Sequence, residues 1–591
     1  MKAFYLVGLV SCAAILFACS NSFSDNDSST GGNTYSSAQS SGTGGSGAGT
    51  GNGGPGTGAG AGAGAGSATA TGTSTGTHTV LTAPSVPSSA AVVEINLSTK
   101  TASIPSGLTD AVTVTSTAQS VNSTSTDVIS VNSTSSSVVT YRLSGTLANG
   151  MFAVQNSSAD YIVELNGTSI SSTVTPPMLL KKGTAYIVTA GGSTNTFTDG
   201  RDFTSSADYG DYDQKGAIHA TKDMVLAGSG TLNVANAGYK SGIYSKGILS
   251  VTGGTVSVTS VGKSCMGAAN GFLMWDGNIT LAGNGTTTDD ETKGIKVDGD
   301  ESSDGAGLGY IVIYGGSITS NTQSKGITAG WDIDEDAETS DTSDDPNPYV
   351  EINGGTINIT TTCTPYETAT ASCSPEGIEG KAGLTINGGN ISINSTDDCL
   401  NVSADGGRLV INGGSVYARS STNDAVDSNG TITINGGTVV AVGTRTPECA
   451  FDCDANTFAV TGGLLVGLGT SNYTAPASSY CTQNTFVVSS GYYSAGNSFV
   501  IKDSGGNVVF AYAVPSNSAT VNGAGDLMIL SSPALSNGSY TLYSGASLSG
   551  GSAFNGLYAS GSLPGASGGT SVASVTASSS VTTVGNIRQG F

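Results

Sequence analysis

The sequence predicts an all-β protein whose central part is a parallel β-helix. Three observations lead to this prediction: a recurring double-glycine turn, apolar residues that alternate on both sides of the turn, and a spacing of 23 to 26 residues between the later copies. Few of the 591 residues show helical periodicity, and the chain combines 87 Gly with only 11% charged residues. Such repeats stack into a solenoid, which offers long faces and columns of side chains rather than a central pocket.

The clearest repeat is an Asn-Gly-Gly turn between two short alternating strands, which occurs in Val350–Ile359, Leu384–Ile393, Leu409–Ala418 and Ile432–Ala441. The last turns begin at Gly388, Gly413, Gly436 and Gly462, so they are 25, 23 and 26 residues apart. Three strands of five to six residues plus their turns need about that many residues. The Asn residues before these turns should stack as a ladder of amides from coil to coil.

The N-terminal residues indicate export rather than a folded element. Residues 1–19 are a short basic and apolar leader that ends in Leu-Phe-Ala-Cys and is followed by Ser20, which resembles a bacterial lipobox with Cys19 as the lipidated residue. The alternative is an unlipidated secretory signal. Residues 20–89 are rich in Gly, Ser and Thr and have few apolar side chains to bury, so we expect a disordered tether.

The remaining chain divides by composition and periodicity. We expect a β-rich segment over residues 90–137, the parallel β-helix over 138–479, a small C-terminal β-domain over 480–550, and a Gly/Ser-rich tail over 551–591. The C-terminal β-domain should cover the open end of the solenoid, because an unpaired strand edge invites aggregation.

The charge and the rare residue types limit the function. A net charge of −23 opposes binding to nucleic acid and suits calcium, although acidity can also serve solubility alone. With only two His, a histidine-based metal site or catalytic triad is close to excluded. Cys363 and Cys373 bracket a short loop and are expected to form a disulfide. Cys265 and Cys399 are expected to be small buried residues, whereas the pairing of Cys449, Cys453 and Cys481 stays open.

Acidic residues recur between the turns and predict a metal site. Aligned copies read Asp-Asp-Cys-Leu-Asn, Asn-Asp-Ala-Val-Asp and Glu-Cys-Ala-Phe-Asp, and stacking places like charges in adjacent coils, where they repel unless a cation lies between them. Calcium takes six to eight oxygen ligands. The alternative is a set of solvated surface carboxylates, also for a similar pair, Glu376 and Glu379. The predicted calcium ligands and neighbours are Asp397, Asp398, Asn401, Asn423, Asp424, Asp427 and Asp452.

The combination of these motifs resembles a known family. The segments GAIHATKDMVLAGSGTLNV and SGIYSKGILSVTGGTVSV, followed by repeated INGGTI and DAVDSNG, are similar to secreted bacterial carbohydrate-binding β-helix proteins, which are related to the family 9 pectate lyases. The resemblance extends from about Val138 to the C-terminus. It implies a right-handed, single-stranded parallel β-helix, bound calcium, and binding to plant-type or microbial polysaccharides, with lyase relatives that use a Lys as base.

Aromatic and basic residues supply candidate contacts to a sugar polymer. Trp275, Trp331 and Tyr349 fall near turns or at outward strand positions, where rigid amphipathic rings can stack on sugars. Lys293 and Lys325 fall in outward columns, where a charge contact to a polyanion is favoured over a role as lyase base. The alternative for the aromatic residues is core or loop packing.

Together these features favour a calcium-binding, polysaccharide-binding surface lipoprotein without catalytic activity. We expect a monomer in the cell envelope, at the outer membrane or cell surface, which touches the membrane only through its lipid and binds a polysaccharide that can contain uronate. An adhesin or structural surface protein is the alternative, and a calcium-dependent polysaccharide lyase is the third hypothesis. The fold alone cannot choose among them.

Overall fold

The computed structural model describes residues 81–201, 209–237, 240–285, 292–299, 309–331, 348–368, 372–444, 448–454, 457–469, 476–516 and 527–587. The expected leader, the lipidated Cys19 and most of the tether lie outside these residues. The described part is nearly all β and has no α-helix, only two 3-10 turns at Ser106–Leu108 and Gly210–Tyr212. Neither turn has the length and apolarity that a membrane-spanning helix needs.

Most strands fall into three columns, each built of strands that pair with the equivalent strand of the next coil. The first column is a 12-stranded sheet of β3 (Val112–Val121), β4 (Thr124–Ser133), β6 (Gly150–Asn156), β8 (Met178–Leu180), β11 (Gly216–Ala220), β14 (Ser241–Ser245), β17 (Ser264–Ala268), β20 (Lys293–Gly299), β23 (Ile327–Trp331), β28 (Ile378–Gly380), β31 (Leu400–Val402) and β34 (Val426–Ser428).

The other two columns share one long sheet. The second column contains β1 (Ala91–Asn96), β5 (Val139–Leu147), β7 (Tyr161–Ser172), β9 (Ala185–Thr189), β12 (Met224–Gly228), β15 (Ile248–Val251), β18 (Gly271–Met274), β21 (Tyr310–Ile313), β24 (Tyr349–Ile352), β29 (Gly383–Ile386), β32 (Arg408–Ile411), β35 (Thr431–Ile434) and β37 (Phe458–Val460). The third contains β10 (Thr194–Asp199), β13 (Thr231–Asn236), β16 (Thr255–Ser260), β19 (Asn278–Gly283), β22 (Ser317–Thr322), β25 (Thr356–Thr361), β30 (Asn390–Ser395), β33 (Ser415–Ser420), β36 (Thr438–Val442) and β38 (Leu464–Gly469).

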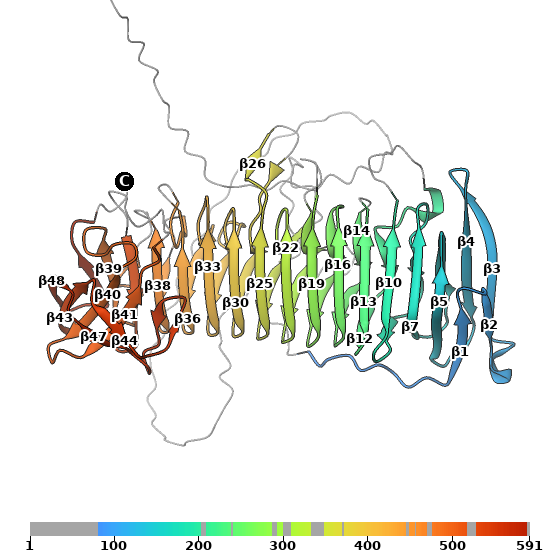
Figure 1. Ribbon diagram of the computed structural model, residues 1–591, viewed down its shortest axis with the longest axis horizontal. Coiled ribbons are helices and arrows are strands. Elements are labelled where there is room, and N and C mark those ends of the chain that lie inside the picture. The colour runs from blue at the N-terminus through green and yellow to red at the C-terminus, as the bar shows by residue number, and fades with distance from the viewer. Residues whose placement is uncertain are drawn as a thin grey trace, which may run out of the picture. The chain divides into compact units, whose positions relative to one another are not determined.

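Neighbouring coils pair in parallel and in register. Leu384 of β29, for example, lies beside Val350 of β24 and Leu409 of β32. Figure 1 shows the third column, from β10 to β38, as a row of neighbouring strands. The chain visits the three columns in turn, as in β28, β29 and β30, before it starts the next coil. This is the arrangement of a β-helix-like fold, and it confirms the predicted parallel three-strand repeat.

The side chains follow the predicted alternation. Leu384, Ile386, Ile391 and Ile393 are fully buried, and their counterparts in other coils form one continuous apolar core. The two small residues expected inside, Cys265 and Cys399, are also fully buried. Burying these columns of Ile, Val and Leu supplies the main stabilisation of the coils, at roughly 25 cal/mol per Å² of apolar surface.

The turn residues explain why Asn-Gly-Gly recurs. A Cβ on Gly388 would lie 2.7 Å from the carbonyl oxygen of Asn353 in the preceding coil, and Gly389 has a φ of 95°, which side chains disfavour. The predicted ladder of amides is present. The Asn387 Nδ2 donates to the Asn353 Oδ1 at 2.8 Å, and hydrogen bonds of the same length join Asn412 to Asn387 and Asn435 to Asn412.

Coiling starts earlier than residue 138, where the sequence analysis placed it. β1 pairs in parallel with β5, and β4 pairs in parallel with β6, so the segment 90–137 already joins the first coils. Two antiparallel strands lie at this end: β2 (Thr101–Ser103) pairs with β1, and β3 pairs with β4. Antiparallel partners of this kind cover the strand edges that a solenoid leaves open.

The C-terminal strands form an antiparallel sheet and also extend the long sheet. The six-stranded sheet consists of β45 (Ala553–Phe554), β46 (Leu557–Tyr558), β41 (Val508–Ala513), β40 (Ser498–Asp503), β43 (Gly538–Ser544) and β48 (Thr570–Ala577), while β44 (Ser547–Ser549) pairs with β47 (Gly565–Ser567). β42 (Leu527–Ser531) pairs antiparallel with both β38 and β39 (Thr485–Ser489), and β49 (Val581–Val584) pairs with β39.

One expectation for the C-terminal part needs correction. Residues 551–591 are not a tail without elements, because β48 and β49 lie in them; their Val and Thr residues suit strands, and Val572 and Val575 pack against the apolar cluster there. The disulfide expected between Cys363 and Cys373 stays a prediction; Cys363 is half-buried and Cys373 is buried. The hairpin of β26 (Tyr366–Glu367) and β27 (Ser372–Cys373) places Tyr366 opposite Cys373.

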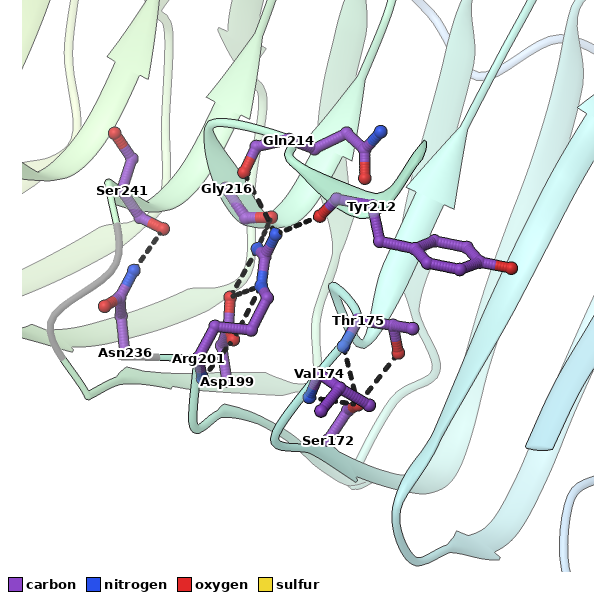
Figure 2. A network of polar contacts seen from close by, with 10 residues as sticks. All are labelled: Ser172, Val174, Thr175, Asp199, Arg201, Tyr212, Gln214, Gly216, Asn236 and Ser241. Carbon is purple, nitrogen blue, oxygen red and sulfur yellow. Dashed lines mark hydrogen bonds and ion pairs between the residues drawn. The ribbon is translucent and has the colours of Figure 1, made fainter. Parts of the chain in front are cut away.

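One ion pair is built into the interior, which the sequence analysis did not predict (Figure 2). The side chains of Asp199 and Arg201 are completely buried, and the Arg201 Nη2 lies 2.6 Å from the Asp199 Oδ2. The Arg201 guanidinium also donates to the carbonyl oxygens of Tyr212, Gln214 and Gly216, at 2.6, 3.2 and 3.1 Å. The pair therefore joins the end of β10 to the start of β11.

Candidate functional site

The predicted acidic residues stack in two neighbouring rows on the first column, which we call the acid rows. Register places Asn401 between Glu379 and Asp427, and Asp427 forms a bridge with Asp452, so the predicted row is confirmed and gains Glu379. The second row contains Glu376, Asp398 and Asp424. Each of them precedes a residue of the first row, Glu379, Asn401 or Asp427, by three positions. The backbone N–H of Asp424 donates to the Asp398 Oδ1 at 3.0 Å, which ties two coils together.

A cavity of about 260 Å³ opens over the acid rows. The hairpin β26–β27 contributes Tyr366 and Cys373 to its wall. Most of the predicted calcium set lines this cavity, together with one acid from the preceding coil: Glu376, Asp397, Asp398, Asn401, Asn423 and Asp427. Glu376 was not included in the predicted calcium set, because the hairpin inserted before it hides its equivalence to Asp398 in the sequence.

Three carboxyl groups of the acid rows resist ionisation in the folded chain. Burial is the main cause that raises the pKa of Asp398, Asp424 and Asp427 well above the usual value, and neighbouring carboxylates raise it further. Burial likewise raises the pKa of Glu448 to about 7, with help from Asp452 and Asp397. A cation among these groups would remove the mutual repulsion and favour their charged forms.

At the cavity wall, the side-chain oxygen of Asn401 has no hydrogen-bond partner within the described part of the chain. The Asn401 Oδ1 is buried and accepts no hydrogen bond from the described residues, while its Nδ2 donates to the Glu376 Oε1 at 3.3 Å. Asn401 is only 6% exposed, so an unpaired acceptor there costs free energy of about 1–3 kcal/mol. Amide and carboxylate oxygens side by side are the donor set that calcium prefers, so the residues fit a hard cation.

Two members of the predicted set point elsewhere. Oxygens of Asp424 and Asp452 gather with the Cys449 Sγ, and these ligand atoms lie within 4.8 Å of one another. The backbone N–H of Cys449 donates to the Asp424 Oδ1, which occupies that oxygen. Asp424 and Asp452 are therefore neighbours of the cavity rather than part of its lining.

Lys325 lies at the N-terminal end of the acid rows and forms ion pairs with two acids. Its Nζ lies 2.9 Å from Glu376 and 2.8 Å from the Glu379 Oε2, which also accepts a hydrogen bond of 2.8 Å from Thr328. Burial would lower the pKa of Lys325, but the charges of the two Glu outweigh it and raise that pKa. For Glu379, burial is outweighed by Lys325 and Lys381, which lower its pKa.

The pKa of Glu376 is raised, first by burial and then by neighbouring acids, although the same ammonium opposes this. A single ammonium compensates one carboxylate fully, so we assign the persistent negative charge to Glu379, which has more donors. Lys325 is thus a protonated, buried partner of these acids. It is not a side chain displayed for ligand contact.

Two of the aromatic candidates, Trp275 and Tyr349, do not line the cavity. Trp275 stacks on Tyr314 with ring centroids 5.5 Å apart, and Tyr349 is buried against Tyr310 on the second column. Lys293, in β20 of the first column, is only 6% exposed. The Trp331 side chain lies outside the described part of the structure.

Comparison with known proteins places the chain in a family. The model of the carbohydrate-binding domain-containing protein family matches residues 125–422, just over half of the chain. A solved structure of the polysaccharide lyase-like protein from C. thermocellum, a gadolinium derivative, aligns with 45% of this chain and 93% of its own, at 20% identity and a TM-score of 0.33. No curated protein matches the sequence. The chain belongs to the carbohydrate-binding domain-containing protein family.

Proposed function

We propose that this protein binds an extended polysaccharide along the first column and that calcium at the acid rows takes part in the binding. The observation that carries the proposal is the cavity over buried carboxylates with the unpaired Asn401 Oδ1 in its wall. Membership of the carbohydrate-binding family supports the ligand class. A flat column of stacked residues suits a polymer that contacts several coils at once.

Calcium would be held by Asp397, Asp398, Asn401 and Asp427. Asn423 would keep Asp397 in place, because its Nδ2 donates to the Asp397 Oδ1 at 2.6 Å. When bound, the ion would supply positive charge at an acidic surface and so make room for carboxylate groups of a uronate-containing polymer. Without it, the net charge of −23 would repel such a ligand.

We propose binding without cleavage. β-Elimination needs a base that can accept a proton, and the ammonium of Lys325 is stabilised by Glu376 and Glu379 instead of being poised to lose its proton. The wider proposal is a monomeric lipoprotein, anchored through Cys19 and displayed on its tether at the outer membrane or cell surface. We further propose that the coils wind right-handed, as is usual for crossovers between parallel strands.

The test is binding of the full chain to immobilised polygalacturonate and to a neutral glucan, with calcium or with chelator. We expect retention on polygalacturonate only with calcium, and no absorbance from unsaturated products. Asp398→Asn should abolish retention, whereas Asp405→Asn, at an exposed position, should leave it intact. Product formation would instead favour a lyase, and absence of glycan binding in both conditions would favour an adhesin.

A further inference from the structure

Four aromatic rings gather on the outer side of the second column. Trp275 and Tyr314 stack with their planes inclined by 13°, and Tyr310 and Tyr349 stack with theirs inclined by 22°. With Leu273 and Val312 they form an apolar cluster separate from the core of the coils. Their strand neighbours alternate with them and point inward, so this cluster faces outward. We call the four rings the aromatic platform.

The segment before β1 meets this platform at Leu81. The backbone N–H of Leu81 donates to the Tyr314 hydroxyl at 3.1 Å, and the Trp275 Nε1 donates to the Leu81 carbonyl oxygen at 3.3 Å. The Leu81 side chain packs against the same cluster. Figure 1 shows this segment passing the lower ends of several strands before it enters β1. Side chains of the platform thus bond both backbone polar groups of a residue 233 positions away from Tyr314.

Burial along this segment repeats every third residue. Leu81, Pro84 and Pro87 are partly buried, and the residues between them are exposed. Polyproline II has three residues per turn and leaves its backbone groups open to partners. The two prolines hold their own φ near −65°, and each restricts the residue before it to extended conformations. Aromatic surfaces with Trp and Tyr donors recognise segments of this kind.

We propose that the aromatic platform is a binding site for an extended, proline-containing peptide segment, and that its ligand is residues 81–87 of the same chain. This clasp fixes where the N-terminal part of the chain joins the coils. The platform lies on the second column and the acidic cavity on the first, so the clasp holds the segment on a face other than the one proposed for polysaccharide. The inference does not rest on the proposed function.

The experiment uses Trp275 as reporter. The chain has two Trp, so Trp331→Phe leaves Trp275 alone in the full-length protein. In this background Leu81→Asp should shift the emission of Trp275 to longer wavelength, increase its quenching by acrylamide, and open the segment to proteolysis. Val86→Asp introduces the same charge at a position that is 40% exposed and should change none of these readouts.

A second variant and a peptide complete the test. The double variant Pro84→Gly/Pro87→Gly keeps Leu81 and should give a partial shift, because it loosens the segment without adding charge. A synthetic peptide with the sequence of residues 80–89, added to the Leu81→Asp protein, should restore the original emission. Unchanged emission in Leu81→Asp, an equal effect of Val86→Asp, or failure of the peptide to restore the signal would each overturn the proposal.

Discussion

Replacing Arg201 should destabilise the protein more than any exposed substitution. Arg201→Met removes the guanidinium that bonds both oxygens of Asp199 and three backbone carbonyls, while the Asp199 carboxylate stays fully buried. Removing one partner of a buried ion pair costs about 3–5 kcal/mol, because an uncompensated charge is left behind. The carbonyls that lose their donors add to this cost, so we expect the upper part of that range.

The assay is equilibrium unfolding in urea, combined with hydrogen exchange of peptides from β10 and β11. The hydrogen exchange matters because a long stack of repeats can open locally, and a single transition cannot be assumed. The matched control is Arg142→Met, which removes a pair of surface ion bridges to Glu94 and Glu164. The Arg142 side chain is 33% exposed, so the control should cost at most about 1 kcal/mol.

A double variant separates charge burial from packing. Asp199→Leu/Arg201→Met removes both charges, so it should recover part of the stability that Arg201→Met alone loses. The reasoning about the buried pair is wrong if Arg201→Met lowers the free energy of unfolding by less than about 1 kcal/mol. It is also wrong if the losses of Arg201→Met and Asp199→Leu simply add up in the double variant.

Three further predictions concern the acid rows and the amide ladder. In chelator, the melting temperature should fall as pH rises above about 4, because folding raises the pKa of the buried acids and the folded chain therefore binds more protons than the unfolded chain. Calcium should make the melting temperature less dependent on pH. A melting temperature that rises with pH in chelator would contradict this prediction. Asn387→Ala should cost about 1 kcal/mol in urea unfolding through two lost ladder bonds, against none for exposed Asn390→Ala. Lys325→Met should cost about 3–5 kcal/mol by leaving the buried Glu379 carboxylate without its ammonium partner, whereas Lys100→Met, at the exposed pair with Asp127, should cost under about 1 kcal/mol; equal losses would refute this.

The repeat could be predicted from the sequence because it depends on residues that are close together in the chain. Alternation fixes which residues face the core, and a Gly is needed wherever a turn meets the carbonyl of the preceding coil, as at Gly388. Register then follows from the turns, so the stacking of Asn401, Asp427 and Asp452 could be predicted without coordinates.

Features that depend on distant or irregular segments could not be predicted in this way. Arg201 bonds carbonyls 11 to 15 positions further along the chain, and Leu81 bonds Tyr314 over 233 positions, so no local pattern marks either contact. Tyr349 was expected to be available for sugar stacking because its strand position faces outward, but it is buried within the aromatic platform, where it stacks on Tyr310. The strand β48 was missed because it is rich in Ser and Thr and because Val572 and Val575 are three positions apart, which breaks the period of two that marks a strand.

The most direct test of the central claim is a calorimetric titration of calcium into the full chain, with and without saturating polygalacturonate. If calcium and polysaccharide meet at the acid rows, the polysaccharide must strengthen calcium binding by the same factor by which calcium strengthens polysaccharide binding. We predict a measurable calcium affinity that rises in the presence of the polymer and is lost in Asp398→Asn but kept in Asp405→Asn. Calcium binding that is absent, or equally strong with and without the polymer, would contradict the account.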